Sequence, residues 1–179
     1  MRITSLIFML AASFAFLVGG SNAQTSQDEP IQTEACSYVG SMPTRFSSAE
    51  EDDRLTVQII GNGCDEPYLA VTISNSEDEV LYSHGFPALW ASYECEPVEN
   101  CVRAAFKSAL VAPRNFSEAN FAPLEQALQD DYYYDVDEPA YAYAQKEDRP
   151  LYCYQSGKSV RDCIVFMDGE AVRTHAAGT

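Results

Sequence analysis

Alternating hydrophobic and polar residues predict several β-strands in the first half of the chain. In residues 55–60 every second residue is hydrophobic, which is the period of a half-buried strand. Residues 68–73 repeat the pattern, and residues 80–83 follow a polar turn at 75–79. A short strand is also expected near residues 37–39. Because short connections favour antiparallel neighbours, the three longer segments predict a three-stranded meander.

The hydrophobic spacing changes after this meander and predicts a helix. Pro97 suits the first helical position, and hydrophobic residues then recur every three or four positions as far as Leu110. Pro113 ends the helix because proline cannot donate a backbone hydrogen bond. A second, shorter helix is expected within residues 117–129, where Ser117 can act as the N-cap.

The C-terminal third returns to a strand pattern. Residues 151–155, 160–167 and 170–174 are expected to be strands, and Asp168-Gly169 predicts a tight hairpin because a type I′ turn needs positive φ at both positions. The predicted fold class is therefore α+β. We expect two three-stranded antiparallel segments, which could join into one sheet, with one or two helices packed on one face.

The N-terminus has the composition of a secretory signal. Arg2 is followed by a short apolar run and then by small residues ending at Ala23, whereas a membrane anchor needs roughly 20 apolar residues. We therefore expect cleavage and an extracytoplasmic location, either periplasmic or secreted. The expected organisation is a signal peptide at 1–23, a disordered lead-in at 24–35, a globular domain at 36–175 and a disordered tail at 176–179.

Six cysteines follow the expected cleavage site, and an even number in an exported chain predicts disulfide bonds. Zinc is the competing interpretation, but no two cysteines have the C-x-x-C spacing of structural zinc sites. Proximity in the sequence selects the pairs Cys36–Cys64, Cys95–Cys101 and Cys153–Cys163.

The chain is strongly acidic, with 27 Asp and Glu against 11 Lys and Arg and a net charge of −16. This charge disfavours nucleic acids and anionic membrane surfaces, both of which attract clustered cations. A charge-selected partner would be a cationic protein. The rest of the chain has no second long apolar segment, so no membrane span is expected after signal cleavage. No motif predicts a cofactor.

Nucleophilic catalysis has few candidates. A serine or cysteine nucleophile usually needs an adjacent histidine, and the chain has only His84 and His175. We interpret His84 as a residue near a strand end and His175 as part of the frayed C-terminal tail. A small extracytoplasmic hydrolase that uses His84 is kept as an alternative.

An acidic, tyrosine-rich loop is expected at residues 130–149. Tyrosines and carboxylates suit contact with a basic partner through cation–π and charge pairing. Carboxylates also suit Ca²⁺, so a calcium-stabilised domain that uses Asp131 with Asp135 and Asp137 is a second alternative. We favour a non-enzymatic binding or envelope-accessory protein. Its candidate binding residues are Tyr132, Tyr133, Tyr134, Asp135, Asp137, Tyr141 and Tyr143.

Overall fold

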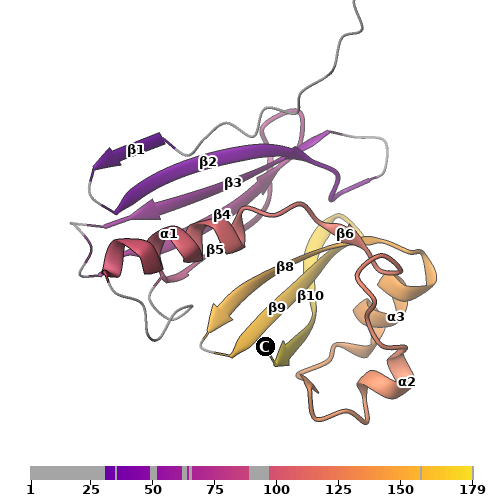
Figure 1. Cartoon of the computed structure of the whole chain (residues 1–179). Helices are drawn as coiled ribbons and strands as arrows, with labels where there is room; N and C mark the ends of the chain where they lie inside the picture. The colour runs from indigo at the N-terminus through magenta and orange to yellow at the C-terminus, as the bar shows by residue number, and fades with distance from the viewer. Residues whose placement is uncertain are drawn as a thin grey trace, which may run out of the picture.

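A computed structural model of the chain describes residues 31–34, 36–48, 52–61, 64, 66–88, 97–157 and 159–178. The helices in this part are α1 (Val98–Ala109), α2 (Leu124–Ala127) and α3 (Glu138–Lys146). The strands are β1 (Ile31–Glu34), β2 (Ser37–Thr44), β3 (Asp53–Ile60), β4 (Tyr68–Ser74), β5 (Val80–Pro87), β6 (Arg114–Asn115), β7 (Tyr133–Tyr134), β8 (Pro150–Gly157), β9 (Val160–Met167) and β10 (Glu170–Gly178). They form two antiparallel sheets, which we name sheet A and sheet B (Figure 1).

Sheet A is a meander of five strands in the order β1-β2-β3-β4-β5. Along β3 and β4 every second side chain is buried, as the sequence pattern predicts. Leu55 pairs with Ile73, and Ile59 pairs with Leu69. Because directly paired residues point to the same side of a sheet, these side chains all lie on one face, the inner face of sheet A.

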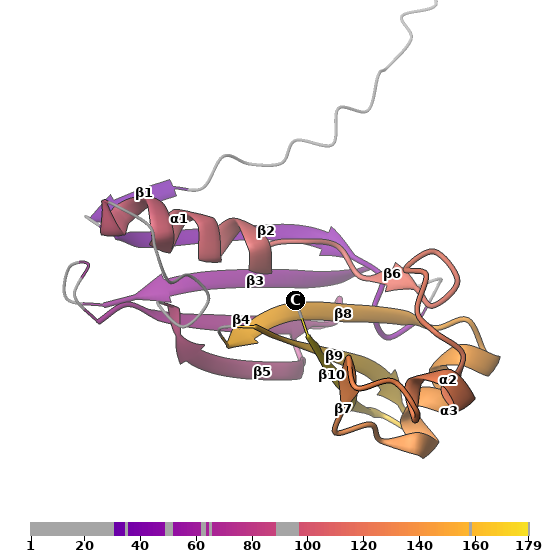
Figure 2. The same cartoon turned by 60° about the horizontal axis from the view of Figure 1, so that its bottom comes forward.

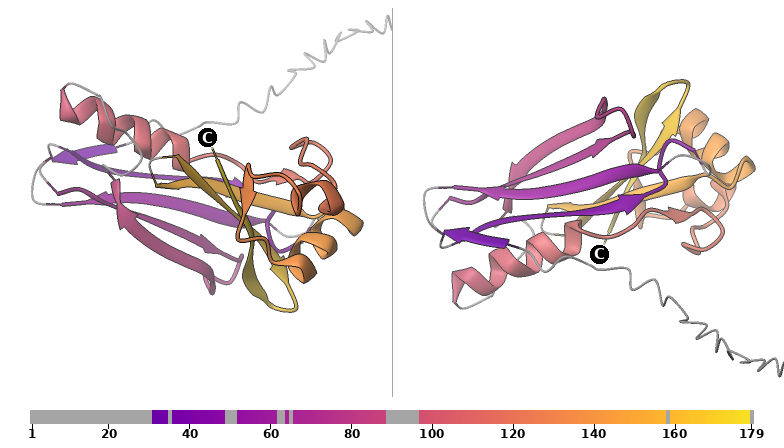
Figure 3. Two further views of the ribbon diagram at one scale, coloured as in Figure 1. Left: turned by 90° about the horizontal axis from the view of Figure 1, so that it is seen from below. Right: turned by 90° about the horizontal axis from the view of Figure 1, so that it is seen from above.

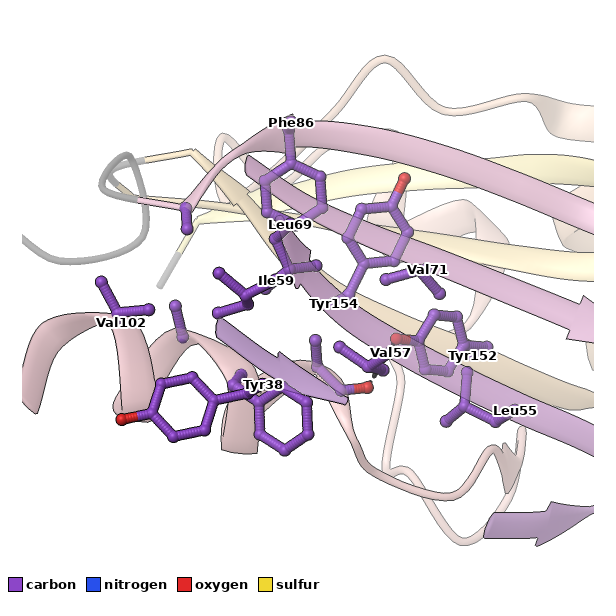
Figure 4. Packing of buried hydrophobic residues seen from close by; sticks show 14 of the residues in the cluster. Tyr38, Leu55, Val57, Ile59, Leu69, Val71, Phe86, Val102, Tyr152 and Tyr154 are labelled. Atoms are coloured by element: carbon purple, nitrogen blue, oxygen red, sulfur yellow. Dashed lines mark hydrogen bonds between the residues drawn. The ribbon is translucent and has the colours of Figure 1, made fainter. Parts of the chain in front are cut away.

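Helix α1 and strand β8 cover the inner face of sheet A. A Cβ atom at Gly40 would lie 2.8 Å from the Phe106 ring, so glycine in β2 allows α1 to pack directly on the strand. Tyr152 is fully buried, and its hydroxyl donates a 2.6 Å hydrogen bond to the Ala109 carbonyl at the end of α1. Figure 4 shows Tyr152 and Tyr154 among the side chains of strands β3 and β4. This packing joins α1 to both sheets.

Sheet B has the order β6-β8-β9-β10-β7, and its two faces belong to different hydrophobic clusters. Tyr152, Tyr154 and Ile164 pack against sheet A. On the opposite face Leu151, Cys163 and Val165 pack with side chains of α3. The views in Figures 2 and 3 accordingly keep α1 with sheet A, and α2 and α3 with sheet B.

The structure confirms the α+β class but corrects the strand count. The prediction of three strands in each half is wrong, because each sheet has five strands and the two sheets are separate. The expected short strand near residues 37–39 is the first part of the eight-residue β2. Strands β1, β6 and β7 were not predicted, since segments of two to four residues are too short to show a period.

Both ends of the predicted globular domain are also corrected. Residues 31–34 of the expected disordered lead-in form β1, which pairs with β2. Residues 176–178 of the expected disordered tail belong to β10, in which Ala176 and Ala177 are buried. The physical reason is register: Gly178 pairs with Val160, so a hairpin that uses all of β9 needs a partner strand that extends this far. The predicted signal peptide lies outside the described residues.

Helix α3 lies within the segment that was expected to be a loop. Asp137 is its N-cap and accepts a 2.9 Å hydrogen bond from the Ala140 amide, and Pro139 occupies the first turn. These start signals are present in the sequence, but the Ala-Tyr-Ala-Tyr alternation that follows has the period of a strand. The predicted helix within residues 117–129 is shorter than expected, because α2 begins only after Pro123.

Two of the three expected disulfides are present. Cys36 bonds to Cys64, and Cys153 bonds to Cys163 across the β8–β9 pair. The third expected pair, Cys95–Cys101, includes Cys95, which lies outside the described residues. None of the helices in the described part of the chain has both the length and the apolar character needed to cross a bilayer.

A buried carboxylate holds the turn between β2 and β3. Asp53 accepts 2.7 Å hydrogen bonds from the amides of Phe46 and Ser47. We expect Asp53→Ala to lower the free energy of unfolding by about 2 kcal/mol, because it leaves these buried donors unpaired. Urea denaturation measures the loss. The matched control is Asp52→Ala, which changes an exposed neighbour and is expected to cost less than about 0.5 kcal/mol. Equal losses in the two variants would contradict this role.

Candidate functional site

The structure divides the predicted tyrosine surface into buried and exposed residues. Tyr141 is fully buried, and its hydroxyl donates a 2.7 Å hydrogen bond to the Ala122 carbonyl. Tyr133 is half-buried and accepts a 3.2 Å hydrogen bond from the Ala122 amide. Tyr143 is also half-buried, while Tyr132 is 47% exposed. The candidate tyrosines therefore do not all lie at the surface, since Tyr141 is buried, and the structure does not describe the side chain of Tyr134.

The two predicted binding aspartates already have structural partners. Asp135 forms an ion pair with Arg173 of β10, and Asp137 caps helix α3. Among the residues that the structure describes, no three His, Cys, Asp or Glu side chains gather as they would around a metal ion. The calcium alternative through Asp131, Asp135 and Asp137 therefore gains no support from the geometry.

His84 is exposed on β5 and lies among aromatic side chains. Its ring centroid is 5.9 Å from that of Phe86 and 5.9 Å from that of Tyr154, and it stacks with Tyr82 at 6.3 Å. The hydroxyls of Tyr82 and Tyr154 are 2.6 Å apart, and burial raises the pKa of both tyrosines. Within the described residues no hydrogen bond or ion pair joins His84 to a carboxylate or a nucleophile. The hydrolase alternative therefore stays a prediction without a catalytic arrangement to support it.

His175 is the largest departure from the sequence prediction. The residue is fully buried on the face of sheet B that carries α3, rather than frayed at the terminus. The rings of Phe121, Tyr133 and Tyr141 surround it, with centroids 5.1 to 5.3 Å away. Its Nδ1 lies 2.9 Å from the Thr174 hydroxyl. Burial lowers the pKa of His175 to about 4, so the ring is neutral at pH 7.

We name these rings the histidine cluster: Phe121, Tyr133, Tyr141 and His175. The cluster fastens the chain between β6 and α3 to sheet B, since Phe121 and Tyr133 belong to that connection and His175 belongs to β10. The Tyr133 hydroxyl and the Tyr141 hydroxyl also bind the two backbone groups of Ala122. This connection, whose residues from 130 onward the sequence predicts to be a loop, is therefore held in a defined position.

The exposed side chains of this fastened segment are strongly acidic. Residues 115–145 contain no Lys or Arg. All of the acidic side chains in this range are exposed. We name them the acidic face: Glu118, Glu125, Asp130, Asp131, Asp135, Asp137 and Glu138.

The acidic face contains a shallow hollow, and two exposed hydrophobic side chains neighbour its lining residues in the sequence. Glu125, Asp130 and Asp131 line the hollow, which is open to solvent. Leu128 is 48% exposed and Tyr132 is 47% exposed. The face therefore combines negative charge, of which the Asp135 carboxylate is paired with Arg173, with apolar side chains. The sequence predicted Tyr132 as a contact residue but not Leu128.

The comparisons with known proteins find no match to this chain. No protein-family model, no curated protein and no solved structure matches the chain significantly. Only the features of this chain itself therefore support the functional proposal.

Proposed function

We propose that the mature chain is an extracytoplasmic, non-enzymatic binding protein whose acidic face contacts a cationic protein. The observation that carries the proposal is the fastened acidic segment at residues 115–145, which presents seven carboxylates and no base. The signal-like N-terminus and the two disulfides support a location outside the cytoplasm.

Charge and rigidity both favour binding at this face. A surface of one sign attracts an oppositely charged partner and raises the rate of association. Tyr132 and Leu128 then supply contact area that excludes water, as aromatic residues do at protein interfaces. The histidine cluster holds the segment in place, so little entropy is lost when a partner docks.

The test uses hen-type lysozyme as a strongly basic probe and measures the dissociation constant by calorimetry. We expect Asp130→Asn combined with Asp131→Asn to weaken binding about tenfold, because charge pairs across an interface commonly contribute 1.5 kcal/mol or more (roughly tenfold in affinity). Asparagine keeps the side-chain oxygen through which Asp130 accepts a 2.9 Å hydrogen bond from the Tyr132 amide. Tyr132→Ala is expected to weaken binding further.

The control changes the same number of charges elsewhere on the molecule. Glu77→Gln combined with Asp78→Asn alters two exposed carboxylates in the turn between β4 and β5. This pair is expected to change the dissociation constant by less than about twofold, since the turn is not part of the acidic face. Equal weakening by both pairs would show attraction by net charge alone and would overturn the assignment of the face. No binding of the basic probe at physiological salt would also overturn it.

A further inference from the structure

A second hollow, of about 310 Å³, lies on sheet B on the side away from sheet A. Leu151 and Gln155 of β8 line it together with Arg114 of β6 and Arg161 of β9. Arg114 pairs with Leu151, and Arg161 pairs with Gln155. Because paired residues point to the same face of a sheet, both arginines lie on the face that α3 covers elsewhere. We name this hollow the arginine pocket.

The arginine pocket has the opposite charge to the rest of the molecule. Arg114 and Arg161 line it, and no Asp or Glu does. The salt bridges in the described part of the chain involve neither arginine. In a chain with a net charge of −16, two cations at one pocket without a carboxylate form a distinct site. Guanidinium groups bind carboxylate and phosphate oxygens in a planar, bidentate geometry.

Apolar side chains also line the pocket. Val111, Phe121 and Leu151 line it, and Cys153, which lies between Leu151 and Gln155 on β8, contributes the disulfide to Cys163. Leu151 and Gln155 are four residues apart on β8, so their partners Arg114 and Arg161 are separated by roughly 13 Å along the strand direction. The pocket therefore combines two cations that are offset along β8 with apolar lining side chains. Its volume is at the lower end of the range for small-molecule sites, about 300–1,000 Å³.

The C-terminal end of α1 borders the pocket through Ser108. Unpaired carbonyls at a helix C-terminus would repel an anion. Here the Ala105 carbonyl accepts from the Ser108 hydroxyl at 2.8 Å, and the Ala109 carbonyl accepts from the Tyr152 hydroxyl at 2.6 Å. The Phe106 carbonyl accepts from the Leu110 amide at 3.0 Å. Three carbonyls near this helix end, those of Ala105, Phe106 and Ala109, thus have hydrogen-bond donors within the protein.

We infer that the arginine pocket binds a small organic dianion with an apolar middle. One anionic group pairs with Arg114, the other pairs with Arg161, and the connecting chain lies on Val111, Phe121 and Leu151. This site is separate from the acidic face, and its ligand has the opposite charge, so it does not depend on the proposed protein partner.

The test uses octanedioate, an unbranched chain with a carboxylate at each end, and measures binding by calorimetry at physiological ionic strength. We expect saturable binding that either Arg114→Gln or Arg161→Gln weakens about tenfold, because a charge-assisted hydrogen bond contributes about 1.5 kcal/mol or more. Octanoate, which has one carboxylate, is expected to bind about tenfold more weakly than octanedioate for the same reason. Both arginines are exposed and have no ion pair among the described residues, so the variants should keep the wild-type melting temperature.

The matched control is Arg54→Gln, which removes the same charge from an exposed position on β3. It is expected to leave octanedioate binding unchanged. The inference is overturned if octanedioate shows no saturable binding at millimolar concentrations, or if Arg54→Gln weakens binding as much as Arg161→Gln does. Equal affinity for octanoate and octanedioate would overturn the two-ended ligand. Backbone amide shifts in NMR provide the location: changes at Phe121 and Gln155 support the pocket, and changes confined to other regions contradict it.

Discussion

Replacing both cysteines of the Cys36–Cys64 disulfide by alanine is expected to lower the free energy of unfolding by about 4 kcal/mol. The bridge joins residues 28 apart in the sequence, so its loss frees a long loop in the unfolded chain. The same change at Cys153 and Cys163, which are 10 residues apart, is expected to cost about 3 kcal/mol. Because typical domains have about 5–15 kcal/mol of stability, loss of both bridges should leave the fold marginal or unfolded.

Urea denaturation of the two paired variants measures these losses without disturbing Cys95 or Cys101. The paired variants remove the loop constraint while leaving no unpaired thiol at either site. A thermal melt of the wild-type protein with and without a reducing agent gives an independent reading. An unchanged melting temperature after complete reduction, verified by mass spectrometry, would contradict the prediction.

Lowering the pH from 6.5 to 4 is expected to remove about 3 kcal/mol of stability through His175 alone. Burial lowers the pKa of His175 from 6.5 to about 4 in the folded state. Between these values the unfolded chain binds a proton that the folded protein does not bind, so the free energy of unfolding rises with pH by about 1.4 kcal/mol per unit. The full contribution is present above pH 6.5 and is lost as the pH falls through the interval to 4.

The variant His175→Gln should remove this slope, because glutamine does not titrate. The control His84→Gln changes the exposed histidine of β5 and should keep the slope. Carboxylates also titrate near the lower end of the interval, but they contribute equally to all three proteins. The difference in slope between wild type and His175→Gln therefore isolates His175. Parallel stability curves for wild type and His175→Gln between pH 4.5 and 7 would refute the prediction.

Burial of His175 shows why the histidine cluster was not predicted. The residue directly follows the strand expected at residues 170–174, and the small residues after it carry no period of their own. It is buried because it pairs with Cys163 across β9 and β10, and because the rings of Phe121 and Tyr141 cover it. Both rings come from segments that are far from His175 in the sequence. The predicted hairpin at Asp168-Gly169 did contain a signal for the length of β10. A partner for the whole of β9 requires a strand that continues past His175.

The tyrosines illustrate the same limit on the candidate site. Sequence chemistry alone made Tyr132, Tyr133 and Tyr141 equal candidates for binding, since all three lie in one acidic segment near Pro139. The structure buries Tyr141 and leaves Tyr132 about half exposed. The difference arises from α3, whose buried face includes Ala140, Tyr141 and Ala144. A helical period therefore selects which tyrosine points inward, and the helix itself was missed.

Local pattern was sufficient for the elements that are periodic and long. The sequence by itself determined strands β3 and β4, helix α1 and the hairpin between β9 and β10, where both Asp168 and Gly169 have positive φ. It also led to the two disulfide pairs of the structure, because cysteines close in sequence have the least loop entropy to lose.

Only the tertiary structure decided how these elements enclose their cores. Residues that are brought together across strands decide three features. These are the division into two sheets, the burial of neutral His175, and the position of Arg114 and Arg161 on one face of sheet B. A hydrophobic period reports which side of an element avoids water, but it does not report which other element covers that side. For this protein, the covering contacts separate a fastened acidic face from a basic pocket on the same sheet.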